Sequence, residues 1–275
     1  MIEERHQFAS DNVAAICPEA WAALQEANAH YAPSYGEDDW TARVCDRIRE
    51  IFETDCDVYF VFTGTAANAL TLAQVCKSFH SIICHQHSHI QTDECGAPEF
   101  FTGGSKLLLV GGADGKIDSD QLKAIADLAQ AHQLSFHMDG ARFANAIASL
   151  NCAPKAITWD VGIDVLCFGG TKNGAGVGEL VIFFDKKISR EFEYRAKQAG
   201  QLGSKMRFLA AQWLGLLTGD TWLRNAQHAN RAARSLASRL RKEAGIKSAF
   251  PVEANAVFVS MNERLASGLH ARGWR

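Results

Sequence analysis

Two short segments near the middle of the chain carry side chains that could take part in covalent chemistry. Residues 137–142 read HMDGAR and include Asp139 and Arg142, and residues 169–173 read GGTKN and include Lys172. Each segment follows an apolar run that we interpret as a buried strand. Because α/β proteins bind ligands at the carboxyl ends of their strands, we expect this carboxylate, guanidinium and amine to share one site.

A lysine and an aspartate placed in this way are the two groups that pyridoxal 5'-phosphate (PLP) requires of a protein. The amine of Lys172 could bond to the cofactor's aldehyde, and an ionised Asp139 could keep the pyridine nitrogen protonated, which strengthens the ring as an electron sink. The glycines that flank Lys172 would leave room for a flat ring. Taken singly, a surface lysine and a helix-capping aspartate are the ordinary alternatives, so the prediction depends on the pair.

A third segment is suited to phosphate binding. Residues 63–65 read TGT, follow an apolar run and open a predicted helix. Helix N-termini present free N–H groups and the positive end of the helix dipole, so we expect Gly64 and Thr65 to bind phosphate. An ordinary strand-to-helix turn with a threonine cap is the alternative. No Gly-Lys-Ser/Thr sequence follows, which excludes a P-loop.

Three alternating histidines, His85, His87 and His89, allow more than one interpretation. On a strand they would share one face and could bind zinc with a more distant carboxylate, as in a zinc hydrolase. A second interpretation keeps only His89, stacked on a cofactor and acting as an acid–base group. Solvated loop histidines are the third possibility. The nearby Asp93 and Glu94 fit either functional interpretation.

Predicted strands alternate with helices from residue 58 to residue 184. The strands are expected at residues 58–62, 81–84, 106–110, 134–138, 165–168 and 179–184. This alternation predicts an α/β fold with a mostly parallel central sheet between helical layers. Residues 1–185 would form the N-terminal segment and the large domain. Residues 186–275 would form connecting helices and a small, incomplete C-terminal α/β lobe.

Composition narrows the functional classes. The 275 residues are 47% hydrophobic and can bury a large core. A net charge of −3 gives no basic surplus for nucleic acid or for a membrane surface. No apolar run approaches the roughly 20 residues of a spanning helix, and the polar N-terminus does not read as a signal peptide. Eight scattered cysteines without a CxxC pair predict reduced thiols in a cytoplasmic protein.

The order of the motifs adds a resemblance to a known family. They are residues 10–12 (SDN), 35–39 (YGEDD), 63–68 (TGTAAN), 88–90 (SHI), 137–142 (HMDGAR) and 171–172 (TK). Over nearly the whole chain this order resembles the low-specificity L-threonine aldolases of the β-eliminating lyase family, in PLP fold type I. The resemblance implies PLP-dependent cleavage of L-threonine, L-allo-threonine and related β-hydroxy-α-amino acids, such as phenylserine, to glycine and an aldehyde. Another β-eliminating lyase or an aminotransferase of the same fold type is the nearest alternative.

The resemblance also implies roles around the cofactor. Lys172 would bond covalently to PLP, and Asp139 would pair with the pyridine nitrogen. Gly64 and Thr65 would hold the phosphate. His89 would stack on the face of the ring and take part in proton transfer. The expected catalytic set is therefore Lys172, His89 and Asp139.

Four further residues would bind the substrate or complete the cofactor site. Ser10 and Arg142 would hold the carboxylate of the amino acid substrate, with Arg142 also beside the cofactor. Tyr35 would line the site from a neighbouring subunit, and Arg207 would lie near the phosphate. Fold type I sites usually draw residues from two subunits, so we expect a homo-oligomer, either a dimer or a tetramer. The resemblance implies no metal.

The chain departs from the family's pattern in two places. The family has a stretch between the positions of Asp118 and Ser119 that carries a strand and a further active-site histidine. It also continues beyond Arg275, with another arginine for the substrate carboxylate. We expect both stretches to belong to the protein without being in this sequence, because residues 115–118 run straight into a predicted helix and leave no crossover. A true deletion would leave the sheet one strand short and the site incomplete.

Overall fold

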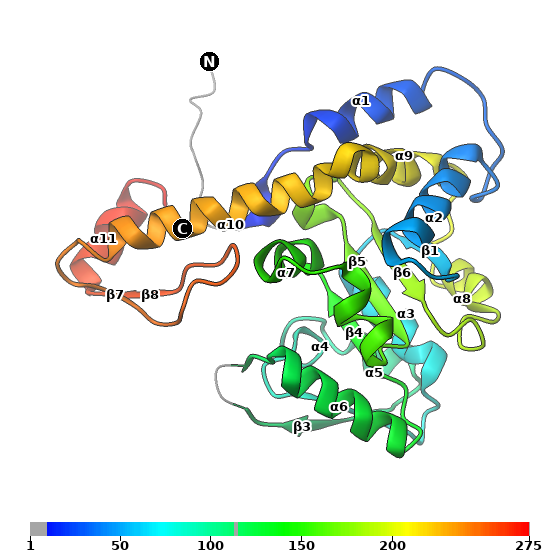
Figure 1. The fold of residues 1–275 in the computed structure, drawn as a ribbon, viewed down its shortest axis with the longest axis horizontal. Helices are drawn as coiled ribbons and strands as arrows, with labels where there is room; N and C mark the ends of the chain where they lie inside the picture. Colours follow the sequence, from blue (N-terminus) through cyan, green and yellow to red (C-terminus); the bar gives the residue numbers. More distant parts are fainter. Residues whose placement is uncertain (1–9, 113–114, 275) are drawn as a thin grey trace.

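The computed structural model describes residues 10–112 and 115–274, and its central element is a four-stranded sheet in the order β1-β6-β5-β4 (Figure 1). These strands are β1 (Asp57–Val61), β4 (His137–Gly140), β5 (Val165–Gly169) and β6 (Glu179–Phe183). β4 and β5 are parallel, whereas β6 is antiparallel to both β5 and β1. Three of the four strands therefore share one direction, and the predicted α/β class is confirmed.

Every residue of β5 and β6 is buried, because helices cover both faces of the sheet. On one face, α3 (Gly64–Val75) and α8 (Phe192–Gln198) pack on Cys167 and Val181. The opposite face packs on three helices, which are α2 (Asp39–Phe52), α7 (Phe143–Leu150) and α9 (Arg207–Leu217). Phe168 belongs to this second face, as the alternation of side chains along a strand requires.

The helix α1 (Pro18–Ala27) lies against α9 outside these layers. Their close approach depends on a glycine in α9. A Cβ atom on Gly215 would lie 2.5 Å from the carbonyl oxygen of Glu19, so no larger residue fits there without moving α1. This contact fixes the N-terminal segment that precedes α1 relative to the sheet.

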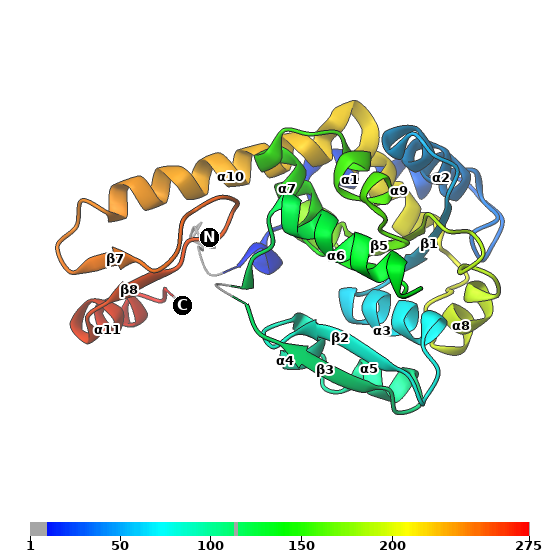
Figure 2. The same cartoon turned by 60° about the horizontal axis from the view of Figure 1, so that its bottom comes forward.

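A second, two-stranded sheet stands apart from the first. It consists of β2 (Ser81–His85) and β3 (Lys106–Val110), which are parallel. The short helices α4 (His89–Thr92) and α5 (Ala97–Phe101) lie between them in the sequence. Figure 2 shows this pair below α3, away from β1 and β5. Leu108, Leu109 and Val110 on β3 are each more than 40% exposed, so this part of the protein is thinly covered.

The expected stretch between Asp118 and Ser119 is not part of this chain. The side chain of Asp118 accepts a hydrogen bond from the backbone N–H of Gln121 and caps α6 (Ser119–Ala131) directly. The chain therefore passes from β3 to α6 with no further strand among the described residues, where β4 pairs only with β5. The sheet is split into a four-stranded and a two-stranded part, and the expectation of an additional stretch stays a prediction.

The C-terminal region projects away from the sheet on one long helix, α10 (Thr221–Leu240) (Figure 1). Beyond it lie an antiparallel pair, β7 (Ile246–Ser248) and β8 (Val259–Met261), and the helix α11 (Glu263–Ala271). The first half of α10 is held against α7 by reciprocal hydrogen bonds between buried Asn145 and Asn230.

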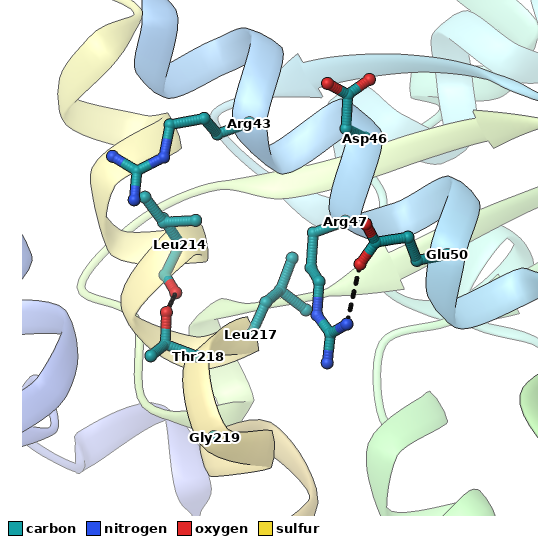
Figure 3. A pocket seen from close by; sticks show the side chains of 8 residues that line it. All are labelled: Arg43, Asp46, Arg47, Glu50, Leu214, Leu217, Thr218 and Gly219. Carbon is teal, nitrogen blue, oxygen red and sulfur yellow. Dashed lines mark hydrogen bonds and ion pairs between the residues drawn. The ribbon is translucent and has the colours of Figure 1, made fainter.

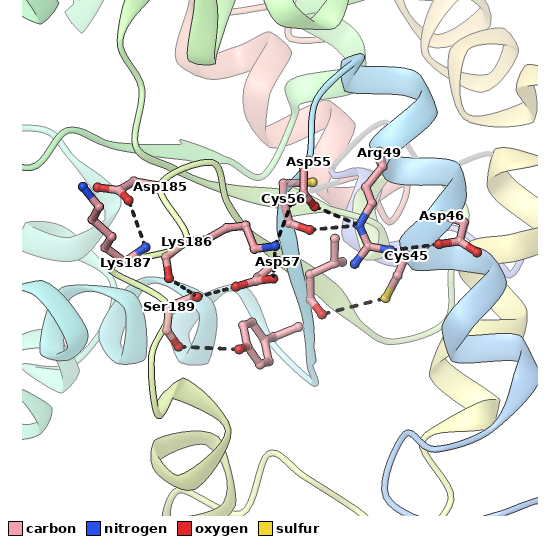
Figure 4. A network of polar contacts seen from close by, with 12 residues as sticks. Cys45, Asp46, Arg49, Asp55, Cys56, Asp57, Asp185, Lys186, Lys187 and Ser189 are labelled. Atoms are coloured by element: carbon pink, nitrogen blue, oxygen red, sulfur yellow. Dashed lines mark hydrogen bonds and ion pairs between the residues drawn. The ribbon is translucent and has the colours of Figure 1, made fainter.

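A network of polar contacts closes the end of the sheet where β1 begins (Figure 4). Ser189 donates a 2.5 Å hydrogen bond to Asp57, and Lys186 forms a 2.8 Å ion pair with Asp55. Burial raises the pKa of the neighbouring thiols to about 11 for Cys45 and about 12 for Cys56, so both stay protonated at neutral pH. These contacts stabilise the fold at the end of β1 opposite to its carboxyl end.

Two global expectations can be compared with the structure. All eight cysteines, each of which lies among the described residues, are free thiols. Within residues 10–112 and 115–274, no helix is long and apolar enough to cross a membrane.

Candidate active site

The segments predicted to bind the cofactor, residues 63–65, 137–142 and 169–173, meet at one edge of the four-stranded sheet. Because β1, β4 and β5 run in the same direction, their carboxyl ends lie on the same side. Gly64 and Thr65 follow β1, Arg142 follows β4, and Lys172 follows β5, while Asp139 lies at the end of β4. The structure thus brings these five residues to a common edge, whereas their roles remain predictions.

The N-terminus of α3 has two backbone N–H groups available for an anion. Thr63 caps the helix by accepting a 3.1 Å hydrogen bond from the N–H of Ala66. The N–H groups of Gly64 and Thr65 have no hydrogen-bond partner among the described residues. A Cβ atom on Gly64 would meet nothing within 4 Å. A phosphate could approach both N–H groups without displacing a side chain.

Asp139 lies within β4 rather than after it, because β4 both begins and ends later than the predicted strand at residues 134–138. Phe136 is not part of the β4 strand, because its backbone N–H donates a 2.7 Å hydrogen bond to a side-chain carboxylate oxygen of Asp164. The Oδ1 atom of Asp139 accepts a 3.0 Å hydrogen bond from the N–H of Ala141. The N-cap of the following helix α7 is Arg142, so Asp139 is not the helix-capping residue that the alternative interpretation required.

A chain of hydrogen bonds connects Asp139 to His89 through two residues that the sequence did not assign. The side-chain amide of Asn68 donates to Asp139 Oδ2 at 2.9 Å and to Glu94 Oε1 at 2.8 Å. His89 Nδ1 lies 2.8 Å from the same Glu94 oxygen. Asn68 was visible only as a polar residue among the apolar positions of α3. This chain joins the two parts of the split sheet.

Lys172 sits in a short 3-10 turn (Thr171–Asn173), and its Nζ has no hydrogen bond or ion pair with a described residue. The glycines before it serve backbone packing. A Cβ atom on Gly169 would lie 2.3 Å from the carbonyl oxygen of Ala141, and one on Gly170 would lie 2.6 Å from that of Gly178. Backbone packing therefore requires glycine at both positions, and the expectation that these glycines also leave room for a ring stays a prediction.

Arg142 is held by a residue that sequence reasoning missed. Its Nε and Nη2 atoms donate to the two carboxylate oxygens of Asp11, at 2.7 and 2.8 Å. Burial raises the pKa of Asp11, but hydrogen bonding and the charge of Arg142 outweigh it and hold this pKa below the ordinary value. Asn255, in the C-terminal region, also donates to Asp11. The Nη1 atom of Arg142 has no partner among the described residues and stays available.

Ser10 lies beside this pair, and the N-terminal turn packs against the turn that carries Lys172. The Ser10 hydroxyl is 3.4 Å from Asp11 Oδ1 and accepts a hydrogen bond from the N–H of Asn12. The 3-10 turn Asp11–Val13 contacts the Thr171–Asn173 turn. Ser10 and Arg142 thus approach each other through Asp11, on the side of the site where Lys172 lies.

Tyr35 and Arg207 are not brought to these residues in the single chain. An ammonium group, that of Lys197, lies 4.1 Å from the centroid of the Tyr35 ring. Arg207 donates to the carbonyl oxygen of Ala27 and lies over the ring of Phe208. Tyr35 thus contacts α8, and Arg207 contacts α1 and α9.

The three histidines do not form a metal site. His89 begins the helix α4 instead of continuing the strand β2, so it does not share a face with the other two. His85 and His87 contact each other, with their ring centroids 5.4 Å apart. No group of three or more potential ligands that could hold a metal ion occurs within the described residues. The zinc hydrolase interpretation therefore has no support in the structure.

A shallow depression lies elsewhere on the surface, between α2 and the end of α9 (Figure 3). Its lining includes Arg43, Leu214 and the ion pair of Arg47 with Glu50. It contains none of the residues at the carboxyl ends of β1, β4 and β5. We therefore assign no part of the chemistry to this depression.

The residues at the sheet edge fit PLP in three respects. The N-terminus of α3 has unpaired N–H groups for a phosphate, Asp139 presents a carboxylate of fixed orientation, and the Lys172 amine is unpaired. An α/β sheet with this set of groups defines the class of PLP-dependent enzymes of fold type I.

The chain belongs to the beta-eliminating lyase family, whose model matches residues 7–124 and 117–264. It is 50% identical to the low specificity L-threonine aldolase of Pseudomonas aeruginosa, over 310 positions that span all of this chain and 90% of that protein. A second Pseudomonas protein of the same name is 48% identical. The structure of Leishmania major threonine aldolase superposes with a TM-score of 0.91 over 97% of this chain and 88% of that one, at 24% identity.

These comparisons also locate the difference between this chain and its relatives. The alignment to the Pseudomonas aeruginosa protein covers 310 positions, 35 more than the 275 residues of the chain. The two matches to the family model meet at residues 117–124, where the chain passes from β3 into α6. The overlap of the two family-model matches thus lies at the place where the sheet is split.

Proposed function

We propose that this protein is a PLP-dependent aldolase that cleaves L-threonine, L-allo-threonine and related β-hydroxy-α-amino acids, such as phenylserine, to glycine and an aldehyde. The 50% identity to a low specificity L-threonine aldolase over the whole chain supports this activity. The single structural observation that carries it is the position of Lys172 and Asp139 at the ends of adjacent parallel strands.

The cofactor would be held by three sets of groups. Lys172 would bond to its aldehyde, Asp139 would bind its pyridine nitrogen, and the N–H groups of Gly64 and Thr65 would bind its phosphate. When bound, PLP supplies an electron sink for the electron pair released as the Cα–Cβ bond breaks. His89, linked to Asp139 by hydrogen bonds, would lie beside the ring.

The substrate would be oriented by the residues around Arg142. Asp11 occupies the Nε–Nη2 side of the guanidinium, which leaves Nη1 for the substrate carboxylate. The hydroxyl of Ser10 would bind the same carboxylate. Fixing this group selects which bond at Cα is aligned for cleavage, and His89 would accept the proton of the β-hydroxyl group.

We further propose that the working unit is a homo-oligomer in which Tyr35 and Arg207 act in the site of a neighbouring subunit. In their own chain, Tyr35 contacts Lys197 on α8 and Arg207 contacts α1 and α9, and within the described residues no hydrogen bond or ring contact joins either of them to Gly64 or Lys172. Mixing inactive Lys172→Ala and Arg207→Ala subunits tests this arrangement. Hybrid oligomers should regain part of the activity if the sites are shared, whereas mixtures that stay inactive would contradict sharing.

A cytoplasmic location and a division into residues 1–185 and 186–275 are proposals of the same kind. The free state of all eight cysteines supports a reducing compartment. The projection of α10 and the elements after it from the sheet supports a separate C-terminal part, whereas α8 and α9, which also lie within residues 186–275, pack on the sheet. Limited proteolysis of the purified protein tests the division, because cleavage should concentrate between the two units.

A spectrum and a product assay test the function. Purified protein supplied with PLP should show a near-visible band that depends on Lys172, and L-threonine should yield acetaldehyde and glycine in equal amounts. In Lys172→Ala, both the band and the acetaldehyde should be lost, by more than about 1000-fold for activity. Lys123→Ala, on an exposed surface, is the control. Production of a 2-oxo acid in place of acetaldehyde would instead identify an aminotransferase or a β-eliminating lyase.

A further inference from the structure

We propose that Glu94 is a positioning residue, which together with Asn68 determines which ring nitrogen of His89 carries the proton. This inference rests on the proposed function, because it gives His89 its state as a proton acceptor. Glu94 belongs to the loop between α4 and α5 and does not reach the cofactor groups itself. It acts through His89.

The contacts of Glu94 define its role. Its side chain is completely buried, and its Oε1 atom lies 2.8 Å from His89 Nδ1. The amide nitrogen of Asn68 donates to the same oxygen at 2.8 Å and also to Asp139 at 2.9 Å. One buried carboxylate therefore joins the histidine of the two-stranded part to the aspartate of the four-stranded part.

An ionised carboxylate can only accept hydrogen bonds, so the proton on the neutral His89 ring must sit on Nδ1. The Nε2 atom then presents its lone pair and can receive a proton from a substrate hydroxyl group. The carboxylate of Asp93 also lies 3.4 Å from Nε2, but its side chain is 80% exposed, so solvent screens it and the closer, buried Glu94 has the stronger hold on the ring proton. A carboxylate behind one nitrogen and a reacting group before the other is the arrangement by which catalytic triads orient a histidine base.

The burial of Glu94 has a cost that stability alone does not explain. Burial raises its pKa above the ordinary value of 4.5, against the hydrogen bonds of Asn68 and His89, and its Oε2 atom has no partner among the described residues. A carboxyl group with a raised pKa destabilises the folded state as pH rises from 4.5 through the raised value. Residues that lower stability in this way are typical of functional sites.

The charged groups around this network are few. Asp93 faces His89 from the same loop, and Asp139 on β4 raises the pKa of Glu94 further. Behind Asp139, the thiol of Cys167 on β5 has a pKa raised by burial and then by the charges of Asp139 and Glu94. His89 is thus surrounded by acidic groups, and Glu94 is the buried one in direct contact with it.

The test compares Glu94→Gln and Glu94→Asp with the control Asp120→Asn, an exposed carboxylate on α6, in the cofactor-loaded protein. The amide of Glu94→Gln has the same size but no charge, so thermal stability at pH 7 should be equal or higher. We expect kcat for L-threonine to fall at least about tenfold, with KM changed less than about twofold. Asp120→Asn should stay within about twofold of wild type in both constants. Glu94→Asp, which keeps the charge, should retain more activity than Glu94→Gln.

A second readout does not depend on activity. The ¹⁵N chemical shifts of the His89 ring at high pH report which nitrogen carries the proton. Wild type and Asp120→Asn should show protonation at Nδ1, whereas Glu94→Gln should show a mixture of the two tautomers. Unchanged tautomer and kcat in Glu94→Gln would overturn the inference, and so would loss of folding in both Glu94 variants, which would make the residue structural. A wild-type protein that releases no acetaldehyde would instead overturn the proposed function.

Discussion

The two parts of the split sheet are built very differently. In the four-stranded part, every residue of β5 and β6 is buried between helices, and Lys172 and Asp139 project from its edge. In the two-stranded part, β3 exposes three apolar side chains, and the local core consists of Leu72, Ile82 and Ile90. The groups that would bond to the cofactor thus rest on the well-packed part, whereas His89 rests on the thinly covered one.

The difference shows which parts of the site depend on the sheet and which depend on side-chain contacts. The carboxyl ends of β1, β4 and β5 keep their common edge because β6 lies between β1 and β5 and binds both. The β2–β3 pair, in contrast, reaches the site through the contacts of α3, above all the bonds of Asn68 to Glu94 and Asp139. The cofactor site therefore depends on the sheet, and the placement of His89 depends on side-chain hydrogen bonds.

After the loss of Lys172, replacing Asp139 should cause the largest fall in activity, and it tests the part of the site that rests on the four-stranded sheet. Asp139→Ala should fold, because the side chain is exposed at the strand end, but kcat should fall about 100-fold or more without the charge at the pyridine nitrogen. Steady-state kinetics with L-threonine measures this change, and Asp120→Ala, an exposed carboxylate on α6, is the control. Full activity of Asp139→Ala would remove the electron-sink role of Asp139.

Core substitutions in the two parts of the sheet should lower the free energy of unfolding by different amounts. Phe168→Ala deletes a ring that packs against Phe52, Phe143 and Trp213 and should lower the free energy of unfolding by about 3–5 kcal/mol. Leu109→Ala on β3 should cost less than about 1 kcal/mol, since the side chain is half exposed. Urea denaturation of both variants measures the difference. Equal losses would show that the two-stranded part is as well packed as the other.

Removing one of the hydrogen bonds that hold Arg142 should have a smaller effect on the kinetic constants. In Asp11→Asn the amide can accept only one of the two hydrogen bonds, so the guanidinium loses its fixed orientation. The KM for L-threonine should rise about tenfold, with a smaller change in kcat. Asp120→Ala is again a suitable control. An unchanged KM would mean that Arg142 does not bind the substrate carboxylate.

The smallest effect concerns acid stability. The folded-state pKa of Asp11 is depressed, so its contribution to stability is present above the ordinary value of 3.8 and is lost as pH falls through the lowered value. Because Arg142 is nearly half exposed, we expect under about 1 kcal/mol. Thermal unfolding of wild type and Asp11→Asn from pH 3 to pH 7 should show a difference that shrinks toward acid. A constant difference would contradict the ion pair's contribution.

Sequence patterns predicted the elements that carry the site because strands and helix N-termini depend on local order. The apolar runs before Thr63 and Gly169 placed Gly64, Thr65 and Lys172 after strands. Because these strands run in the same direction, the three residues lie at the same edge of the sheet. The strand before Asp139 was placed too early, since Phe136 bonds to Asp164 outside the ladder. An apolar run cannot reveal such a distant partner.

The supporting residues could not be predicted because each acts through a partner far away in the chain. Asp11 meets Arg142 across 131 positions, and Asn68 meets Asp139 across 71. The purpose of Gly169 was also hidden, because the neighbouring Ala141 backbone that excludes a side chain belongs to another strand's end. The expectation that a further stretch belongs between Asp118 and Ser119 stays a prediction, since one sequence cannot distinguish a deletion from an omitted segment.

The central claim is that the amine of Lys172 bonds to PLP at the edge where Asp139 lies. Reducing the cofactor-loaded protein with borohydride fixes the cofactor on its lysine, and mass spectrometry of the digested protein identifies the peptide that carries it. We predict a single labelled peptide containing Lys172, and no label in Lys172→Ala. A label on another lysine, or none in wild type that has taken up PLP, would contradict the account.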